Sequence, residues 1–320
     1  MKTCLLALAS ATVTAALALN AAANVQRPKI LGVAHMAIYE NDLAKARAFY
    51  EGFLGFAEPY ALKRKNGSGD RIAFIKINDY QYLELFAEPP QHDGHLNHIS
   101  FQTDDAEAMR EYLASQGVPV PDKVGKGQIK NLNFNIKDPD NHTVEIVQYT
   151  PDGWSMQNKG KFMPHTRISD HMTHVGVTIG NLDASMKFYH GILGFTEFWR
   201  GAAGAGKSLS WVNMRVPDGT DYLELMLYRN YPSPEQLGTK NHVCLVVPDI
   251  EKAVATLKAR PAYKDYGKEI KIQVGVNRKR QANLYDPDGT RIEVMEPNTI
   301  DGKPAPSSDA PAPVGQRPTI

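Results

Sequence analysis

Four histidines and four glutamates recur along the chain in one fixed order, and they are the residues best suited to chemistry. Each histidine opens a short apolar segment, and each glutamate lies between two aliphatic residues 47 to 51 positions further on. Two imidazoles and two carboxylates together make a donor set that suits a divalent transition metal. We therefore predict metal ligation by the pairs His35 with Glu84, His98 with Glu145, His174 with Glu224, and His242 with Glu293.

A purely structural interpretation of these residues also exists. A single histidine on a strand is commonly a partly buried residue, and a single glutamate on a one-sided sheet commonly faces water. Four copies with the same order and similar spacing are harder to explain in that way. The metal-binding hypothesis is therefore preferred for at least one set, and whether both sets bind metal stays open.

Strand alternation predicts which way these side chains point. In the segment that begins at His174, large aliphatic residues occupy every second position, and the histidine lies on the opposite face among small residues. The same alternation holds around His35, His98 and His242, and it places each glutamate on the histidine side of its own strand. The aliphatic face is expected to pack on a helix, which leaves the histidine face free to surround a site.

A long internal repeat indicates how these strands are embedded. Residues 35–56 and 174–195 align without a gap, and eight of 22 positions are identical. In both copies a strand is followed by a helix-capping Asp or Asn, an amphipathic stretch and a terminal Gly. Weaker copies start at His98 and His242, so the chain contains four similar units. The four predicted capping residues are Asp42, Asp105, Asn181 and Asp249.

Each unit is predicted to form a strand, a helix and then about three further strands. Two units make one domain, so we expect an α+β protein with a first domain at residues 30–150, a linker at 151–169 and a second domain at 170–296. The later strands and the turns of the final hairpins are expected at 72–77, 82–86, 131–136, 138–141 (DPDN), 143–148, 208–215, 222–228 and 286–289 (DPDG).

The charge and the N-terminus bear on partners and location. The formal net charge is +1 at pH 7 without Lys/Arg clusters, so neither nucleic acid nor an anionic membrane is an expected partner. Residues 1–23 resemble a signal peptide, and an uncleaved N-terminal anchor is the alternative. Cleavage leaves Cys244 as the single cysteine. A periplasmic or secreted location, with no membrane attachment after cleavage, is expected.

Two Gly- or Pro-rich segments are predicted to be irregular. Residues 297–320 are rich in Pro, Ala and Ser and nearly devoid of large apolar side chains, so they are predicted to be a disordered tail. The stretch GAAGAGKS at 201–208 resembles a phosphate loop, but a strand rather than a helix follows it. It is predicted to be a mobile hairpin loop.

Several other polar residues carry weaker signals. His92 and His95 precede His98 in a turn, where the direction of a side chain is not fixed. Basic residues could bind an anionic substrate, although solvated surface charge is the simpler interpretation of each. These residues are Arg71, Arg200, Lys207, Arg278 and Arg280.

The combined motifs resemble the vicinal oxygen chelate superfamily, which includes glyoxalase I, extradiol dioxygenases, acyl-CoA epimerases and the fosfomycin- and bleomycin-resistance proteins. The matching features are the His-opened strands, the FYxxxLGF helix end and the DPDGxxIE close, and together they span nearly all of residues 30–296. The resemblance implies four βαβββ modules paired into two domains with cupped mixed sheets. If neighbouring modules pair, it implies one ligand set of His35, Glu84, His98 and Glu145, and another of His174, Glu224, His242 and Glu293.

A set of two histidines and two glutamates is similar to that of glyoxalase I. There the metal holds two substrate oxygens, one glutamate moves a proton next to a carbonyl, and the metal stabilises the enediolate. On this resemblance Glu145 and Glu293 are the predicted ligand-bases. The protein is expected to be a lyase or isomerase of a small substrate with adjacent oxygens. Export argues against a glutathione adduct, because glutathione is a cytosolic thiol.

Two alternatives stay open. Four modules in one chain also resemble extradiol dioxygenases, which implies an Fe(II) triad of His174, His242 and Glu293. However, the position where that subfamily carries a tyrosine holds Asn283. Resistance-type members bind a drug in the same cup without catalysis. The sequence does not determine the metal (Fe, Mn, Ni or Zn), the substrate or the oligomeric state.

Overall fold

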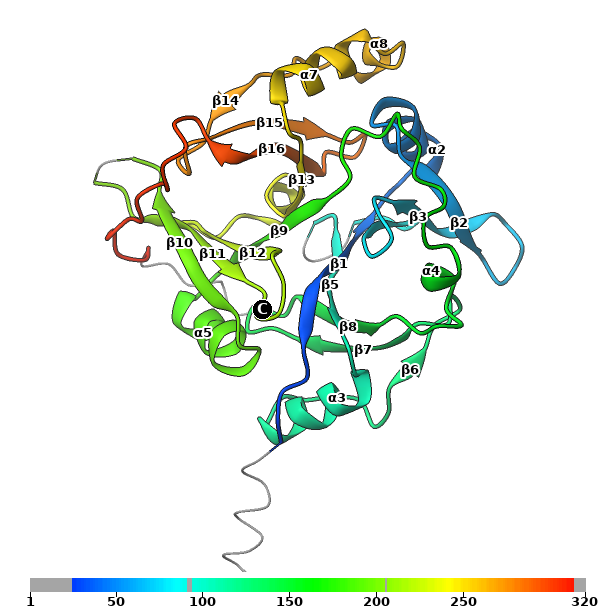
Figure 1. Cartoon of the computed structure of the whole chain (residues 1–320), viewed down its shortest axis with the longest axis vertical. Coiled ribbons are helices and arrows are strands. Elements are labelled where there is room, and N and C mark those ends of the chain that lie inside the picture. The colour runs from blue at the N-terminus through cyan, green and yellow to red at the C-terminus, as the bar shows by residue number, and fades with distance from the viewer. Residues whose placement is uncertain (1–24, 91–93, 205, 314–320) are drawn as a thin grey trace, which may run out of the picture.

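The structure is a computed structural model that describes residues 25–90, 94–204 and 206–313 (Figure 1). It contains two eight-stranded mixed sheets, and each sheet is built from two consecutive βαβββ modules. The predicted α+β architecture of four modules in two cupped domains is confirmed, and neighbouring modules share a sheet. The predicted signal peptide at 1–23 lies outside the described residues.

The first domain contains modules 1 and 2. Its strands lie in the order β2-β3-β4-β1-β5-β8-β7-β6, with β1 and β5 antiparallel at the centre. Module 1 consists of β1 (Ile30–Tyr39), α2 (Leu43–Arg47), the π-helical η2 (Ala48–Phe53), β2 (Ala57–Lys63), β3 (Asp70–Lys76) and β4 (Tyr82–Phe86). Module 2 consists of β5 (Leu96–Thr103), α3 (Ala106–Ser115), β6 (Gly125–Lys126), β7 (Leu132–Lys137) and β8 (Thr143–Gln148), and α4 (Trp154–Gln157) follows in the linker.

The second domain repeats this plan. Its strand order is β10-β11-β12-β9-β13-β16-β15-β14. Module 3 consists of β9 (Met172–Ile179), α5 (Leu182–Met186), the π-helical η3 (Lys187–Ile192), β10 (Thr196–Ala202), β11 (Leu209–Arg215), β12 (Tyr222–Leu227) and α6 (Pro234–Leu237). Module 4 consists of β13 (His242–Val246), α7 (Ile250–Ala259), α8 (Tyr263–Tyr266), β14 (Gln273–Val274), β15 (Lys279–Tyr285) and β16 (Arg291–Thr299).

The first and last strands of every module are parallel neighbours. β1 pairs with β4, β5 with β8, β9 with β12, and β13 with β16. Because the crossover helix and two strands intervene between each pair, the strand that carries the histidine lies directly beside the strand that carries the glutamate. This topology brings together residues that are about 50 positions apart in the sequence.

All four predicted helix caps are confirmed. The side chains of Asp42, Asp105, Asn181 and Asp249 each accept a hydrogen bond from a backbone N–H in the first turn of the following helix. The helices of modules 1 and 3 continue as π-helical turns and are followed by glycines with positive φ, at +78° and +79°. The caps therefore fix where each helix leaves its histidine strand.

One apolar core lies on the convex faces of the sheets and includes residues of both domains. The alternation in β9 is as expected, because Val175, Val177 and Ile179 are at most 2% exposed and belong to this core. The histidines lie on the opposite, concave faces. Burial of the aliphatic face stabilises the fold, and the other face is left for polar residues.

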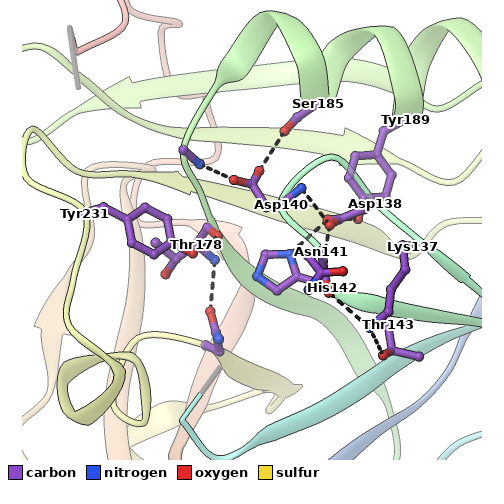
Figure 2. Close-up of polar contacts among 12 residues, drawn as sticks. Lys137, Asp138, Asp140, Asn141, His142, Thr143, Thr178, Ser185, Tyr189 and Tyr231 are labelled. Atoms are coloured by element: carbon purple, nitrogen blue, oxygen red, sulfur yellow. Dashed lines mark hydrogen bonds and ion pairs between the residues drawn. The ribbon is translucent and has the colours of Figure 1, made fainter. Parts of the chain in front are cut away.

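The two domains are joined by reciprocal contacts between a helix of one domain and the final hairpin turn of the other. Tyr50 of η2 donates its hydroxyl to Asp286 at 3.0 Å, and Tyr189 of η3 donates to Asp138 at 2.8 Å. Figure 2 shows the second joint, where His142 also contacts Asp138 at 2.9 Å. The DPDN and DPDG turns therefore hold the halves together as well as closing hairpins.

A hydrogen-bonded pair connects the domains between these joints. Gln81 and Asp221 occupy equivalent positions before β4 and β12, and the Gln81 amide donates to Asp221 at 3.2 Å. Gln81 also accepts from the backbone N–H of Met172, and Asp221 accepts from that of Val33. The halves are thus related by an approximate two-fold arrangement.

The prediction of a disordered tail at 297–320 is wrong for the described part. Strand β16 continues to Thr299, and later residues lie against β10 and β11. The backbone N–H of Ser308 donates to Arg200, and the backbone N–H of Leu209 donates to Pro311. Backbone hydrogen bonds to an edge strand can order a segment without apolar side chains, which composition does not reveal. Residues 314–320 lie outside the described residues.

The stretch at 201–208 contains the end of β10 and the connection to β11, so its hairpin position is as predicted. Its described residues and the C-terminal segment line a cavity of about 680 Å³. None of the helices in residues 25–90, 94–204 and 206–313 has the length and apolar character that crossing a membrane requires.

Candidate metal centres

The first centre lies on the concave face of the first sheet. His35 of β1 and His98 of β5 face each other, with 2.9 Å between their Nε2 atoms. Nε2 of His35 lies 2.8 Å from Oε2 of Glu145 in β8 and 3.6 Å from Oε1 of Glu84 in β4. All four side chains belong to residues at most 8% exposed. The structure therefore brings together the four residues that the sequence placed in one set.

The second centre repeats this arrangement. The Nε2 atoms of His174 in β9 and His242 in β13 lie 3.2 Å apart. Glu293 of β16 lies 3.3 Å from His174 and 3.4 Å from His242, and Glu224 of β12 lies 3.5 Å from His242. These residues are also at most 8% exposed. Both sets have formed within single domains.

Strand register leaves little room at the floor of the second centre. Gly176 lies opposite both Glu224 and His242 in neighbouring strands. A Cβ at Gly176 would lie 2.1 Å from Cε1 of His242, so the ring occupies the space that a side chain would take. The first centre has Ala37 at the equivalent position, opposite Glu84 and His98.

Hydrogen bonds at Nδ1 orient one histidine of each centre. Nδ1 of His98 lies 2.7 Å from Oδ1 of Asn97, and Nδ1 of His242 lies 2.9 Å from the backbone oxygen of Lys240. A proton on Nδ1 that is donated to these oxygens leaves the lone pair on Nε2, which faces the centre. That tautomer is the one a metal requires.

The two carboxyls of each centre differ in acidity. Burial favours a raised pKa for all of them. At Glu145 and Glu293 the adjacent histidines outweigh burial, and the pKa of each is lowered well below its ordinary value. Burial prevails at Glu84 and Glu224, so their pKa is raised. Each centre thus holds one strongly acidic carboxyl and one that retains a proton more readily.

The histidines differ between the centres. Burial lowers the pKa of His35, but Glu84 and Glu145 outweigh burial and raise it. At His242, burial and then the positive charge of Arg291 lower the pKa to about 3. His242 is therefore neutral at physiological pH, as a metal ligand must be.

The donor atoms fit a divalent transition metal. One atom each from His35, His98 and Glu145 lie within 4.8 Å of one another. The second centre contains two such groups, His174 with Glu224 and His242, and His174 with Cys244 and Glu293. Imidazole nitrogens combined with carboxylate oxygens suit Fe, Mn, Ni or Zn better than the all-oxygen sites of Ca²⁺ or Mg²⁺.

The walls of the two cups differ in character. The first cup is lined by a separate apolar cluster that includes Tyr82, Phe74 and Phe86, with Tyr82 stacked on His35 at 4.9 Å between ring centroids. The second cup contains a cavity of about 290 Å³ above Glu224 and Glu293. Tryptophan, amide and guanidinium groups line that cavity, which makes the second centre the more polar of the two.

Four of the five basic residues considered from the sequence contact carboxylates outside the two centres. Arg200 pairs with Glu197, Arg278 with Asp301, Arg280 with Glu296, and Arg71 contacts Glu88 at 3.6 Å. Lys207 lies in the exposed glycine-rich loop. His95 contacts Thr290 of the other domain at 3.1 Å, and His92 lies outside the described residues.

Sequence reasoning missed Arg291 and Trp199, which line the second cavity. The signal for Arg291 was available, because it lies two residues before Glu293 on the same strand and therefore on the same face. Trp199 had no comparable signal, since its place depends on pairing of β10 with β11.

The fold and the donor sets are typical of proteins that bind a metal between two paired βαβββ modules. The chain belongs to the Glyoxalase/Bleomycin resistance protein/Dioxygenase superfamily, whose family model matches residues 32–146 and 171–294. The resemblance inferred from the sequence is therefore confirmed, in two copies.

The relatives matched in sequence include one enzyme and one uncharacterized protein. Lactoylglutathione lyase of Schizosaccharomyces pombe is 26% identical over 272 residues, covering 78% of this chain and 84% of the relative. The uncharacterized protein YaeR of Escherichia coli is 31% identical over 128 residues, covering 36% of this chain and 95% of YaeR.

Solved structures extend the comparison. The 2,3-dioxygenase LapB of Pseudomonas sp. KL28 matches with a TM-score of 0.63 and 15% identity, covering 87% of this chain and 97% of LapB. The E323L variant of homoprotocatechuate 2,3-dioxygenase of Brevibacterium fuscum matches with a TM-score of 0.62 and 17% identity. The match covers 88% of this chain and 75% of that dioxygenase. At these identities the structures show a shared fold.

Proposed function

We propose that the protein is a metal-dependent enzyme of the glyoxalase type, acting on a small substrate with adjacent oxygens. The observation that carries this proposal is a complete set of two histidines and two glutamates at each centre, where an Fe(II) triad needs only three ligands. The 26% sequence identity with a lactoylglutathione lyase, over most of both chains, supports the proposal. The proposed reaction moves a proton next to a carbonyl.

The bound ion would supply Lewis acidity, which polarises a substrate carbonyl and makes the neighbouring C–H group more acidic. His98 presents Nε2 to the first centre when its Nδ1–H is donated to Asn97, and His242 presents Nε2 to the second centre when its Nδ1–H is donated to the backbone oxygen of Lys240. The sequence-based hypothesis gives both ligation and proton transfer to Glu145 and Glu293. The directions of the pKa shifts favour a division, in which Glu84 and Glu224 accept the proton and Glu145 and Glu293 stay ionised.

The test uses the full mature chain loaded separately with Fe, Mn, Ni or Zn. Hemithioacetals of methylglyoxal with glutathione and with cysteine are offered, and thioester formation is followed by NMR in deuterated water. We expect metal-dependent conversion of at least one adduct, abolished in the His98→Ala/His242→Ala double variant. Exposed His165, changed to Ala, is the control. Equal conversion by the double variant would overturn the proposal.

An extradiol-type dioxygenase is the second candidate. It is favoured by the compact triad of His174, His242 and Glu293, whose facing atoms are 3.2 to 3.4 Å apart, and by the shared fold with ring-cleaving enzymes. The test is oxygen uptake by the Fe(II)-loaded chain with catechol. Uptake coupled to ring cleavage would place this candidate first.

Export is a separate proposal and rests on residues 1–23. Fractionation of cells that express the full chain, with N-terminal sequencing of the product, tests it. A mature N-terminus near residue 24 in the exported fraction is expected. An intact N-terminus in the cytosol would contradict export and would restore glutathione adducts as natural substrates.

A further inference from the structure

The second cup contains a guanidinium group without an anionic partner. Arg291 is partly buried and lines the cavity above Glu224 and Glu293. Its Nη2 atom contacts the backbone oxygen of Lys240 at 3.3 Å and Nδ1 of His242 at 2.5 Å, and its buried Nε atom has no hydrogen-bond partner. Among the described residues no carboxylate oxygen lies within ion-pair distance of Arg291. Its positive charge acts over a longer distance to lower the pKa of Glu224, which burial raises.

Three other arginines near the sheets have the anionic partner that Arg291 lacks. Arg47, Arg200 and Arg280 each form close ion pairs with a glutamate. A partly buried cation without such a pair is costly unless a ligand supplies the negative charge. The equivalent position in the first domain, two residues before Glu145, holds Thr143, so the unpaired charge is particular to the second centre.

Metal binding at His242 would remove one hydrogen-bond acceptor of Arg291. When His242 presents its Nε2 lone pair to a metal, Nδ1 carries the proton and can no longer accept a hydrogen bond from Arg291. The guanidinium then retains only the carbonyl of Lys240 and a contact of 3.6 Å with the sulfur of Met226. Arg291 lines the cavity, where a carboxylate could accept two of the guanidinium's N–H groups.

The cavity also fits a planar molecule. Its volume of about 290 Å³ is bounded by Trp199 and Trp211, and their flat faces suit a conjugated group. Arg291 and Glu293 are two residues apart on one strand, which separates their Cα atoms by about 6.6 Å. A small ring can span from the metal ligands to the guanidinium over such a distance.

We propose that Arg291 forms an anion subsite of the second centre, so that this centre selects a planar substrate carrying a carboxylate in addition to its adjacent oxygens. The inference rests on the proposed function, because it requires a metal that holds the adjacent oxygens. It assigns to Arg291 a role in specificity that is separate from ligation.

Two probes that differ only in a carboxylate test this inference. Catechol and 3,4-dihydroxybenzoate are titrated by calorimetry into the zinc-loaded mature chain, in a His98→Ala background that removes the first centre. Zinc is chosen because it does not support oxidation. We expect the carboxylate probe to bind about tenfold to hundredfold more tightly than catechol.

Arg291→Gln is expected to abolish this preference, and Arg291→Lys to keep part of it. Arg278→Gln, which changes an arginine paired with Asp301, is the matched control and should leave the preference intact. Bound zinc is measured in every variant, because Arg291 also contacts His242. The affinity ratio, rather than either affinity, is the readout.

Two results would overturn the inference, and they are distinguishable. If Arg291→Gln weakens both probes equally or lowers only the zinc content, Arg291 merely positions His242. If the unsubstituted second centre takes up none of Fe, Mn, Ni and Zn, the proposed function fails at this centre and the anion subsite fails with it.

Discussion

Each centre contains two glutamates of opposite electrostatic character. Glu293 lies 3.3 Å from His174 and 3.4 Å from His242, whereas Glu224 has a single contact of this kind, at 3.5 Å to His242, and burial outweighs His174 to raise its pKa. The first centre shows the same division between Glu145 and Glu84. Pairs of groups whose pKa values are pushed apart are typical of acid and base roles in catalysis.

Substitution of the two glutamates separates these roles. In the His98→Ala background, Glu224→Gln should retain metal at the second centre and slow turnover by about 10²- to 10⁴-fold, the usual worth of a general base. Glu293→Gln should lower the metal content itself, because an ionised ligand is lost. Metal analysis and steady-state kinetics on both variants provide the measurements. Metal loss confined to Glu224→Gln would reverse the assignment.

The ligand residues could be predicted from the sequence because strand alternation and spacing are local signals. The eight histidines and glutamates all lie on concave faces, as expected from period-two alternation. The position of Arg291 on the same face as Glu293 could have been predicted from strand alternation, but the absence of a nearby carboxylate is seen only in the folded structure. The ligand and catalytic roles themselves stay predictions.

Among the elements, β9 and β13 set the geometry of the second centre. His242 packs over Gly176 in the neighbouring strand, where even a methyl group would overlap the imidazole ring. Backbone conformation does not require glycine there, since a positive φ is absent at this position. The small residue is needed because of the side chain opposite.

Gly176→Ala should therefore displace His242 while the sheet remains intact. We expect a loss of about tenfold to hundredfold in metal affinity at the second centre, comparable to loss of an orienting neighbour. Metal titration and circular dichroism measure the two effects. Ala37→Gly at the first centre is the matched control and should keep its metal. Unchanged affinity in Gly176→Ala would show that His242 is not held where metal binding needs it.

Elements were predictable where their signals are local. Caps, strands and hairpin turns follow from short motifs, and the caps lie at the expected residues. The sequence did not predict that the C-terminal segment is ordered, because the carbonyl and N–H groups that it pairs with lie about 100 residues earlier, on β10 and β11. Composition reports side chains and does not reveal such backbone pairing.

At the scale of the whole molecule, the two joints are similar but not equivalent. Glu40 lies at the joint that contains Asp286, Asp288 and Tyr50, whereas Ile179 holds the corresponding position at the other joint. The carboxyl of Glu40 is fully buried. Burial, followed by Asp286 and Asp288, raises the pKa of Glu40 well above its ordinary value of 4.5.

This raised pKa makes stability depend on pH. Above pH 4.5 the unfolded chain releases the Glu40 proton while the folded chain retains it, so stability falls as pH rises toward the folded pKa. Glu40→Gln removes this pH-dependent loss of folding stability, because glutamine does not titrate. We expect its melting temperature to match the parent near pH 4 and to exceed it increasingly toward pH 8, as measured by calorimetry.

Exposed Glu111, changed to Gln, is the control for a simple change in net charge and should show no such trend. A constant difference between Glu40→Gln and the parent at all pH values would contradict an unusually protonated joint. Neither joint could be predicted from local patterns, because Tyr50 and Asp286 are 236 residues apart.

The central claim is that both cups hold a divalent transition metal. The most direct test is the metal content of the mature chain, purified without chelators and measured by mass spectrometry of the ions, together with His98→Ala and His242→Ala. One equivalent for each centre is expected, and each variant should lose only its own equivalent while remaining folded. Absence of bound metal after incubation with each of Fe, Mn, Ni and Zn would contradict the claim and leave a non-catalytic binding protein as the better interpretation.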